Sequence, residues 1–241
     1  DAFCIEVSPM DSHGYFSLAL NGSYAEAMID KAKRVFVEVN ENQPRCLCGT
    51  QLHVSQVDAI VEYNHELPVL PPVAIDEVSQ TIGNLIAEQI PDGACIQLGI
   101  GAIPDATGMA LKSKHDLGIH TEMFTDSMVE LIECGAVNNS KKQIHRGKSV
   151  TTFAYGSKRI YDYVDDNPAI EILPVDYVNN PEVICKNDKA HQSLSEQLKV
   201  HSIRRIYVAI VHGNIKEDSG TVNAPVGRHP TDRKKMSTHC K

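Results

Sequence analysis

The sequence predicts an α/β protein with a mostly parallel sheet and helices on both faces of that sheet. Two observations support this prediction. From residue 75 to about residue 175, short apolar segments of strand length alternate with segments of helical periodicity. A glycine-rich turn, Gly99-Ile-Gly-Ala-Ile-Pro-Asp105, directly follows one apolar strand and opens a helix. Chemistry in parallel sheets collects at the carboxyl ends of strands, so this turn and Glu122, which ends the next strand, are expected on one rim.

The first 70 residues predict a smaller set of elements, followed by a linker. The expected elements are strands over Cys4–Val7, Val35–Val39 and Ala59–Glu62 and a helix over Tyr24–Arg34. The segment Leu67–Pro72 is too rich in proline for a helix or a strand, and it predicts a linker. We therefore expect three parts: residues 1–70, residues 74–188 and residues 189–241.

The second part supplies the strand and helix alternation. Its expected elements are a helix over Ile75–Ile90, a strand over Ala94–Leu98, a helix from Pro104 to Leu111, a short strand within Leu117–Asp126, a helix through Met128–Ile132 that Gly135 ends, a strand over Ser149–Phe153, a helix over Lys158–Val164 and a strand over Ile170–Val175. Beyond Asp188 we expect a helix over Ala190–His201, a strand over Arg205–His212, a hairpin-like turn over Lys216–Thr221 and a basic run over Arg228–Lys235.

Charge is divided unevenly along the chain. The net charge is −8, but residues 1–188 carry 13 Lys+Arg and 27 Asp+Glu, whereas residues 189–241 carry 10 and 4. The first segment is therefore at −14 and the second at +6. Such a change of sign suggests two origins or two partners.

Composition also limits the cellular setting. No apolar run approaches the ~20 residues that a membrane span needs, and no stretch has the form of a signal peptide. Because a strand starts almost at once, we expect the sequence to begin within a longer protein. Seven cysteines, an odd number, fit a reducing cytoplasm better than a disulfide framework. The only close pair, Cys46 and Cys48, is a weak signal for zinc. We expect a cytoplasmic protein without a membrane partner.

The residues at the predicted rim allow more than one interpretation. Backbone N–H groups of the glycine turn, at the positive end of a helix, suit a phosphate or an oxyanion, but the same turn can be purely structural. Glu122 can be a solvated glutamate, and Asn179, just before Asn180-Pro181, can be a turn residue. His120-x-Glu122 has the spacing found in zinc deaminases, but the Pro-Cys-x-x-Cys that such a site requires is missing.

Longer stretches narrow these alternatives. They are Val7-Ser-Pro-Met-Asp11, Val37-Glu-Val-Asn40, Gln97-Leu-Gly-Ile-Gly-Ala-Ile-Pro-Asp105, Gly118-Ile-His-Thr-Glu-Met-Phe-Thr-Asp126 and Pro174-Val-Asp-Tyr-Val-Asn-Asn-Pro181. In this order, residues 1–188 resemble the acetyl-CoA hydrolase/transferase family, in particular its 4-hydroxybutyrate and butyrate CoA-transferase branch. In that family, residues 1–70 correspond to the end of the N-terminal domain and residues 74–188 to the start of the C-terminal domain. The fold is then CoA-transferase-like but incomplete, with a short α+β appendage.

The resemblance implies a role for each rim residue. Glu122 is implied to be the catalytic glutamate, and Asn179 to face the reacting thioester. Gly99, Ile100, Gly101, Ala102 and Ile103 are implied to line the site for coenzyme A, which is a substrate rather than a permanent cofactor. Backbone N–H groups near Ile100 and Gly101 then suit the oxyanion of each tetrahedral intermediate. The implied partners are a short-chain acyl-CoA and a carboxylate, and an intact enzyme of this kind is expected to be a homo-oligomer.

A second resemblance covers the C-terminal end. Lys186–Leu198, Tyr207–Gly213 and Gly220–Met236 resemble the large-subunit-RNA pseudouridine synthase family. The arginine-leucine-aspartate motif that carries that family's catalytic aspartate is absent. By this resemblance Arg228, Arg233, Lys234 and Lys235 face RNA through phosphate contacts, although a solvated basic tail fits equally well. Lys186-Asn-Asp188 fits both families, so a junction is expected on that tripeptide.

The sequence therefore predicts a partial CoA transferase joined to a pseudouridine-synthase-like fragment. The transferase is expected to move coenzyme A between a short-chain acyl-CoA and a carboxylate through a glutamyl-CoA thioester. The alternatives are an RNA-binding module carried by residues 189–241 and a non-functional chimeric fragment.

Overall fold

The computed structural model describes residues 1–47, 51–187, 200, 227–228 and 236–237. The chain divides into two compact units, Asp1–Ser202 and Ile203–Lys241. The following predictions lie outside the described residues: the helix and strand expected between Ala190 and His212, apart from Val200, the turn at Lys216–Thr221, Cys48 of the cysteine pair, and the basic residues Arg233, Lys234 and Lys235.

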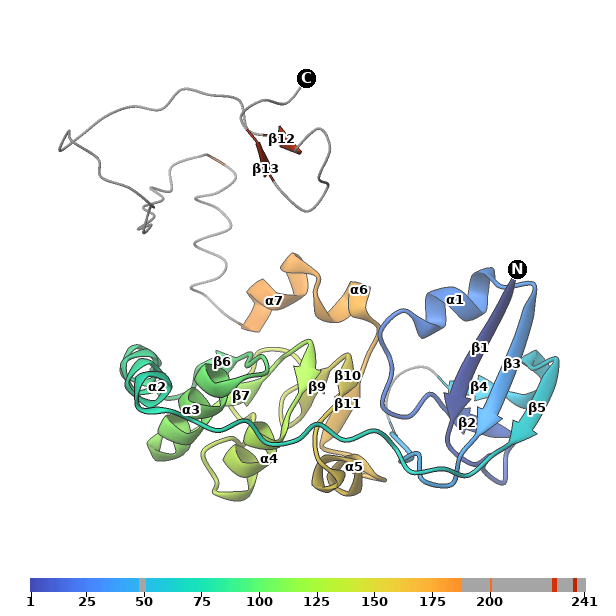
Figure 1. Ribbon diagram of the computed structural model, residues 1–241, viewed down its shortest axis with the longest axis horizontal. Helices are drawn as coiled ribbons and strands as arrows, with labels where there is room; N and C mark the ends of the chain where they lie inside the picture. The colour runs from blue at the N-terminus through green and yellow to red at the C-terminus, as the bar shows by residue number, and fades with distance from the viewer. Residues whose placement is uncertain (48–50, 188–199, 201–226, 229–235, 238–241) are drawn as a thin grey trace. The chain divides into compact units, whose positions relative to one another are not determined.

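The first part of the larger unit is built on a three-stranded parallel sheet (Figure 1). Strand β3 (Arg34–Val39) lies between β1 (Ala2–Val7) and β5 (Ala59–Glu62). Helix α1 (Ala25–Lys31) forms the crossover from β1 to β3, as parallel pairing requires. The buried apolar side chains here are Ile5, Val7, Phe16, Leu18, Ala25, Val35, Val37 and Leu52.

An antiparallel pair that the sequence analysis did not predict completes this part. Strand β2 (Tyr15–Ser17) pairs with β4 (Gln51–His53), which leads into the 3₁₀ helix η1 (Val54–Gln56). Three-residue strands are too short to show an alternating pattern, and their partner lies far along the chain. Their sequence signal is therefore weak.

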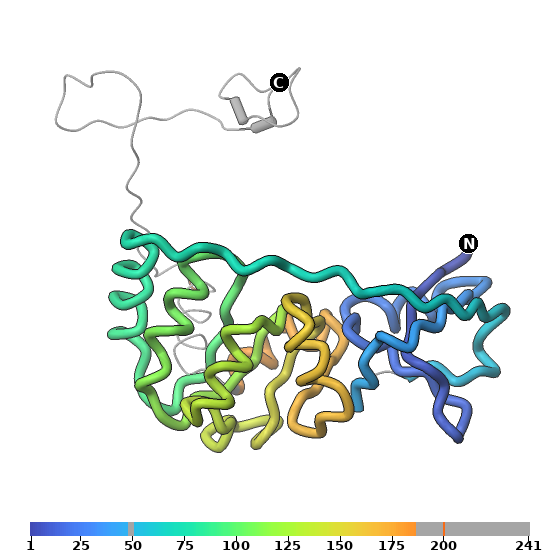
Figure 2. The backbone as a smooth tube through the Cα atoms, turned by 60° about the horizontal axis from the view of Figure 1, so that its bottom comes forward, coloured from blue at the N-terminus to red at the C-terminus, as the bar shows by residue number. Residues whose placement is uncertain are grey.

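The connector from β5 to the second part contains neither helix nor strand between residues 63 and 76, as the prolines of Leu67–Pro72 predict. Figure 2 shows it as an extended segment that reaches α2 (Glu77–Gln89). Two hydrogen bonds hold it to the second part: Leu70 N donates to Gly156 O at 2.9 Å and Tyr161 Oη donates to Pro68 O at 2.5 Å.

The second part alternates helices and parallel strands. Its elements after α2 are β6 (Cys95–Ile96), α3 (Ala102–Ala110), η2 (Leu111–Ser113), β7 (Gly118–Ile119), β8 (Met123–Phe124), α4 (Asp126–Glu133), β9 (Ser149–Thr151), β10 (Phe153–Ala154), α5 (Lys158–Val164), β11 (Ile170–Ile172), α6 (Val175–Val178) and α7 (Pro181–Asn187). The strand pairs β6–β7, β9–β11 and β8–β10 are all parallel. A parallel bridge between His120 and Val150 joins β7 to β9, which gives the order β6-β7-β9-β11. In the view of Figure 1, α4 and α5 lie on one side of these strands and α6 and α7 on the other. The α/β fold class is confirmed.

A hydrophobic core fills the second part. Its fully buried members include Leu111, Leu117, Ile119, Phe124, Met128, Val129, Leu131 and Ile160. Phe124, Met128 and Leu131 come from β8 and α4, directly after Glu122, so burial of this segment fixes the backbone that carries the glutamate.

Three predicted strands differ from the structure, and the first of them, expected within Leu117–Asp126, is divided into β7 and β8. The strand expected over Ser149–Phe153 is divided into β9 and β10, because the N–H groups of Thr152 and Phe153 both donate to the single carbonyl of Glu122, at 3.0 and 3.2 Å. Two residues opposite one interrupt a ladder as a β-bulge does. The strand expected over Ile170–Val175 ends at Ile172, since Pro174 has no N–H to donate to a strand ladder and α6 begins directly after it.

Outside the larger unit, the structure describes one short antiparallel pair. Strand β12 (Gly227–Arg228) pairs with β13 (Met236–Ser237). In the described part of the chain, no helix is long and apolar enough to cross a membrane.

Candidate active site

Glu122 lies between β7, which pairs with β6, and β8, which pairs with β10. Its carbonyl oxygen accepts three hydrogen bonds, the two from Thr152 and Phe153 and one from Thr151 Oγ1 at 3.0 Å. Its neighbour Thr121 is completely buried, whereas the Glu122 side chain is exposed. The backbone is therefore fixed while the carboxylate remains open to a ligand.

Asn179 contacts this carboxylate directly. Its Nδ2 donates to Glu122 Oε2 at 2.9 Å, across 57 residues of sequence. Among the described residues nothing donates to Glu122 Oε1. The carboxamide thus holds one carboxylate oxygen and leaves the other without a donor among the described residues. The structure brings together the two residues that the sequence analysis assigned to the reaction.

Helix α6, whose C-terminal capping residue is Asn179, is hydrogen-bonded to the segment that leads from β7 to Glu122. His120 Nε2 donates to Val178 O at 2.8 Å, and Val175 N donates to Ser23 O at 2.8 Å. A carbonyl only accepts, so Nε2 carries the hydrogen and Nδ1 of a neutral ring does not. Burial lowers the pKa of His120, and its Nδ1 has no partner in the part of the chain that the structure describes. A neutral His120, two residues before Glu122 in the sequence, therefore fixes the C-terminal end of α6.

A second histidine contacts the same helix at Tyr177, the residue before Val178. His145 Nε2 lies 2.7 Å from Tyr177 Oη on α6, and its Nδ1 contacts Glu171 of β11. Lys148 Nζ lies 2.9 Å from the other oxygen of Glu171. This chain of contacts orients the ring of His145 and, through Tyr177, the segment that presents Asn179.

Lys142 is hydrogen-bonded to the last residue of β7. It is almost completely buried, and its Nζ donates to Ile119 O at 2.8 Å and to Lys148 O at 2.6 Å. Burial lowers the pKa of this amine to about 8, although Cys95 and Glu171 act in the opposite direction. Sequence reasoning missed Lys142, His145, Glu171 and Tyr177, because each acts through contacts between residues far apart in the chain and no motif marks them.

The glycine turn opens α3 at the same end of the sheet. Ile96 pairs with Ile119, and His120 N donates to Ile96 O at 3.2 Å, so the residues after β6 run beside those that lead to Glu122. Gly101 has a φ of +118°, which a side chain would strain. Gly99 has no such φ, and a Cβ there would meet no atom within 4 Å. Conformation therefore explains the glycine at 101 but not the one at 99.

Backbone donors of the turn are open. Among the described residues, no group accepts a hydrogen bond from the N–H of Ile100, Gly101, Ala102 or Ile103. The side chains of Ile100 and Ile103 are 57% and 40% exposed, so the turn is accessible. Ala102 and Ile103 form the first helical residues of α3, where the helix dipole favours an anion.

The turn also borders a pocket of about 440 Å³. Ile100 and Gly101 line it together with Asp105, Asp126 and Ser157. Ser157 N and Oγ both donate to Asp126, at 2.9 and 2.5 Å, and burial together with Asp126 raises the pKa of Asp105. Glu122 and Asn179 are not among its lining residues. The structure thus pairs Glu122 with Asn179, whereas the glycine turn lines a pocket to which neither of these residues contributes.

This parallel α/β fold matches the crystal structure of 4-hydroxybutyrate CoA-transferase from Porphyromonas gingivalis, which is 41% identical with a TM-score of 0.75, covering 78% of this chain and 48% of that one. The chain belongs to the acetyl-CoA hydrolase/transferase family. The family's N-terminal domain matches residues 1–71 and its C-terminal domain residues 156–215. The second match extends beyond Asp188, so part of the segment that resembles a pseudouridine synthase also matches this family.

Individual relatives agree with the family. The chain is 48% identical over 188 residues to 4-hydroxybutyrate coenzyme A transferase of Clostridium kluyveri, covering 78% of this chain and 44% of that protein. The crystal structure of RipA from Yersinia pestis is 45% identical with a TM-score of 0.75, covering 78% of this chain and 44% of that one. The chain spans less than half the length of the curated relatives it matches.

The C-terminal resemblance also has a match. An uncharacterized RNA pseudouridine synthase of Bacillus subtilis is 47% identical over 55 residues, which are 23% of this chain and 18% of that protein. Both resemblances expected from the sequence are confirmed, and the second is limited to a short segment.

Proposed function

We propose that this chain carries the catalytic glutamate of a CoA transferase that moves coenzyme A between a short-chain acyl-CoA, such as 4-hydroxybutyryl-, butyryl- or acetyl-CoA, and a carboxylate. The observation that supports this most is the exposed Glu122 carboxylate, one of whose oxygens is held by Asn179 at 2.9 Å. The likeness to 4-hydroxybutyrate coenzyme A transferase supports the substrate class. The chain would act in the cytoplasm, as part of a homo-oligomer when the enzyme is intact.

The proposed reaction begins with attack by Glu122 Oε1 on the thioester carbonyl carbon. A C–O bond forms, the C–S bond breaks, and the CoA thiolate leaves a mixed anhydride. The thiolate then attacks the glutamyl carbonyl, the substrate's carboxylate leaves, and a glutamyl-CoA thioester remains. The acceptor carboxylate repeats both exchanges in reverse, which returns Glu122 as a free carboxylate.

Asn179 has a specific part in the second exchange. Attack on the glutamyl carbonyl places negative charge on its oxygen, and Asn179 Nδ2 already donates to Oε2 of this group. A donor positioned before the charge develops stabilises it without reorganisation. His120 and His145 act as positioning residues, because they hold α6 and do not touch Glu122.

We further propose that Gly99–Ile103 bind coenzyme A through their open N–H groups.

We also propose that the chain is divided into residues 1–70, 74–188 and 189–241. This division is supported by two separate hydrophobic clusters, one before the connector and one mainly after it.

Gly99 offers a test of the coenzyme A site, because conformation does not require a glycine there. We expect Gly99→Val to leave the melting temperature nearly unchanged and to weaken coenzyme A binding at least ~10-fold in calorimetry, since a side chain blocks close approach to the backbone. Gly101→Ala is the matched variant with a strained φ, and it should also lower stability by about 1–3 kcal/mol. Binding by Gly99→Val as tight as that of the parent chain would show that the turn is only structural.

For residues 189–241 we propose weak RNA contact through Arg228, Arg233, Lys234 and Lys235, supported by the likeness to an RNA pseudouridine synthase. For four phosphate contacts on single-stranded RNA, a plot of the logarithm of the binding constant against the logarithm of the salt concentration should have a slope of about −3. Fluorescence anisotropy of a labelled RNA at several salt concentrations measures this slope. Replacing the four residues by glutamine should abolish it, and a variant that binds RNA unchanged contradicts the contact. No isomerisation of uridine is expected.

A further inference from the structure

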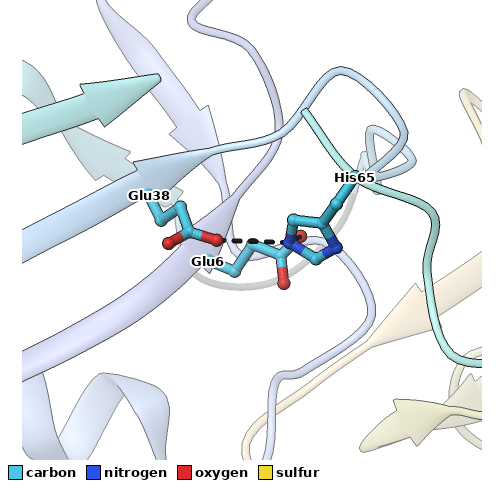
Figure 3. A group of neighbouring side chains, drawn as sticks. All are labelled: Glu6, Glu38 and His65. Carbon is cyan, nitrogen blue, oxygen red and sulfur yellow. Dashed lines mark hydrogen bonds and ion pairs between the residues drawn. The ribbon is translucent and has the colours of Figure 1, made fainter. Parts of the chain in front are cut away.

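Three side chains of the first part converge on one point, far along the sequence from the catalytic glutamate. Glu6 lies on β1, Glu38 on β3 and His65 at the start of the connector (Figure 3). Glu6 and Glu38 pair in register on adjacent parallel strands. Their Oε1 atoms lie 3.4 and 3.2 Å from Nε2 of His65. Like charges side by side on a sheet repel, so a positive charge is needed between them.

The other nitrogen of His65 fixes the ring's tautomer. Nδ1 lies 3.1 Å from Glu66 O, and a carbonyl can only accept, so Nδ1 carries a hydrogen. A neutral ring then directs the Nε2 lone pair toward two carboxylate oxygens. That arrangement is repulsive unless a cation occupies the space between the three atoms. The cation is either a proton on Nε2 or a metal ion.

A fully buried residue holds the cluster in place. Asn40 Nδ2 donates to Glu6 Oε1 at 2.5 Å and to His65 O at 3.0 Å, while its Oδ1 accepts from His65 N at 3.4 Å. Metal-binding histidines commonly donate their second N–H to a carbonyl, as His65 does, and residues behind the ligands orient them, as Asn40 does.

We propose that Glu6, Glu38 and His65 bind a divalent transition-metal ion of the Zn²⁺ type. One imidazole nitrogen and two carboxylate oxygens are a ligand set that Zn²⁺ accepts, with a further position left for water. The three ligand atoms lie within 4.8 Å of one another, and each side chain is half-buried. The ion fastens the start of the connector, through His65, to the ends of β1 and β3. CoA transfer does not require it, so the two proposals stand or fall separately.

Calorimetry with Zn²⁺ on the full chain, first stripped with EDTA, tests the site. We expect one binding event that weakens at least ~10-fold in Glu38→Gln and in His65→Ala. The matched controls are Glu62→Gln, an exposed glutamate on β5, and His115→Ala, whose ring lies 3.9 Å from Asp92. Both controls should keep the parent affinity.

The melting temperature provides a second measurement, in which each variant is compared with itself in EDTA, so that a difference in basal stability between variants does not affect the result. Saturating Zn²⁺ should raise the melting temperature of the parent chain and of Glu62→Gln, because a ligand that binds only the folded state stabilises it. Glu38→Gln, which keeps the side-chain volume, should show no such rise above its own value in EDTA. Equal Zn²⁺ affinity in the parent, Glu38→Gln and His65→Ala would mean adventitious binding at other groups, such as cysteines. That result, or no binding by the parent chain, overturns the proposal.

Discussion

Replacing Glu122 by glutamine is expected to lower CoA transfer at least ~10³-fold, in any preparation of the protein that transfers CoA. Glutamine keeps the size of the side chain and its place beside Asn179, but its amide is a poor nucleophile. The loss should appear in kcat, since the side chain is exposed and contributes little to the fold. Initial rates with an acyl-CoA and acetate as acceptor measure the effect.

The matched control is Glu62→Gln, which makes the same change at an exposed position outside the site. It should retain the parent rate. A Glu122→Gln protein that turns over within a factor of ~10 of the parent would contradict covalent catalysis by this residue.

The second large effect concerns Lys142 and the pH dependence of stability. The pKa of Lys142 is about 8 in the folded protein, whereas the ordinary pKa of a lysine side chain is 10.5. Below pH 8 the amine is protonated in both states, and the folded state bears the full cost of burying the charge. Between pH 8 and 10.5 the unfolded chain holds the proton more tightly, so stability rises with pH by about 3 kcal/mol in total.

The rise should be absent in Lys142→Met, which cannot titrate. Lys141→Met is the matched control, because Lys141 is the adjacent lysine but is 61% exposed and 3.8 Å from Asp116. Urea unfolding from pH 7.5 to 10.5 gives the comparison, and the difference between variants removes the contribution of other groups. A parent chain and a Lys142→Met chain with parallel pH profiles would show that folding does not lower the pKa of Lys142, which contradicts this account.

Elements with strong local signals could be predicted from the sequence. Strand β5 over Ala59–Glu62 and helix α5 over Lys158–Val164 have the predicted bounds, and α2 differs by only one or two residues at each end. The antiparallel pair β2–β4 and the break between β9 and β10 could not be predicted. Both depend on partners distant in sequence, for example the Glu122 carbonyl that two successive N–H groups share.

The candidate site shows the same division. Glu122 and Asn179 were indicated by stretches that resemble a family, and the structure joins them. The roles of His120 and His145 follow from contacts across 58 and 32 residues, which a linear pattern does not contain. The Glu6, Glu38 and His65 cluster likewise forms only when β1, β3 and the connector come together.

Trapping the glutamyl-CoA thioester tests the central claim most directly. The purified protein is incubated with an acyl-CoA, reduced with borohydride, digested and analysed by mass spectrometry. The account predicts a modification on the peptide that holds Glu122, absent without acyl-CoA and absent in Glu122→Gln. A modification that persists unchanged in Glu122→Gln, or that maps to another carboxylate, would contradict the assignment of Glu122 as the nucleophile.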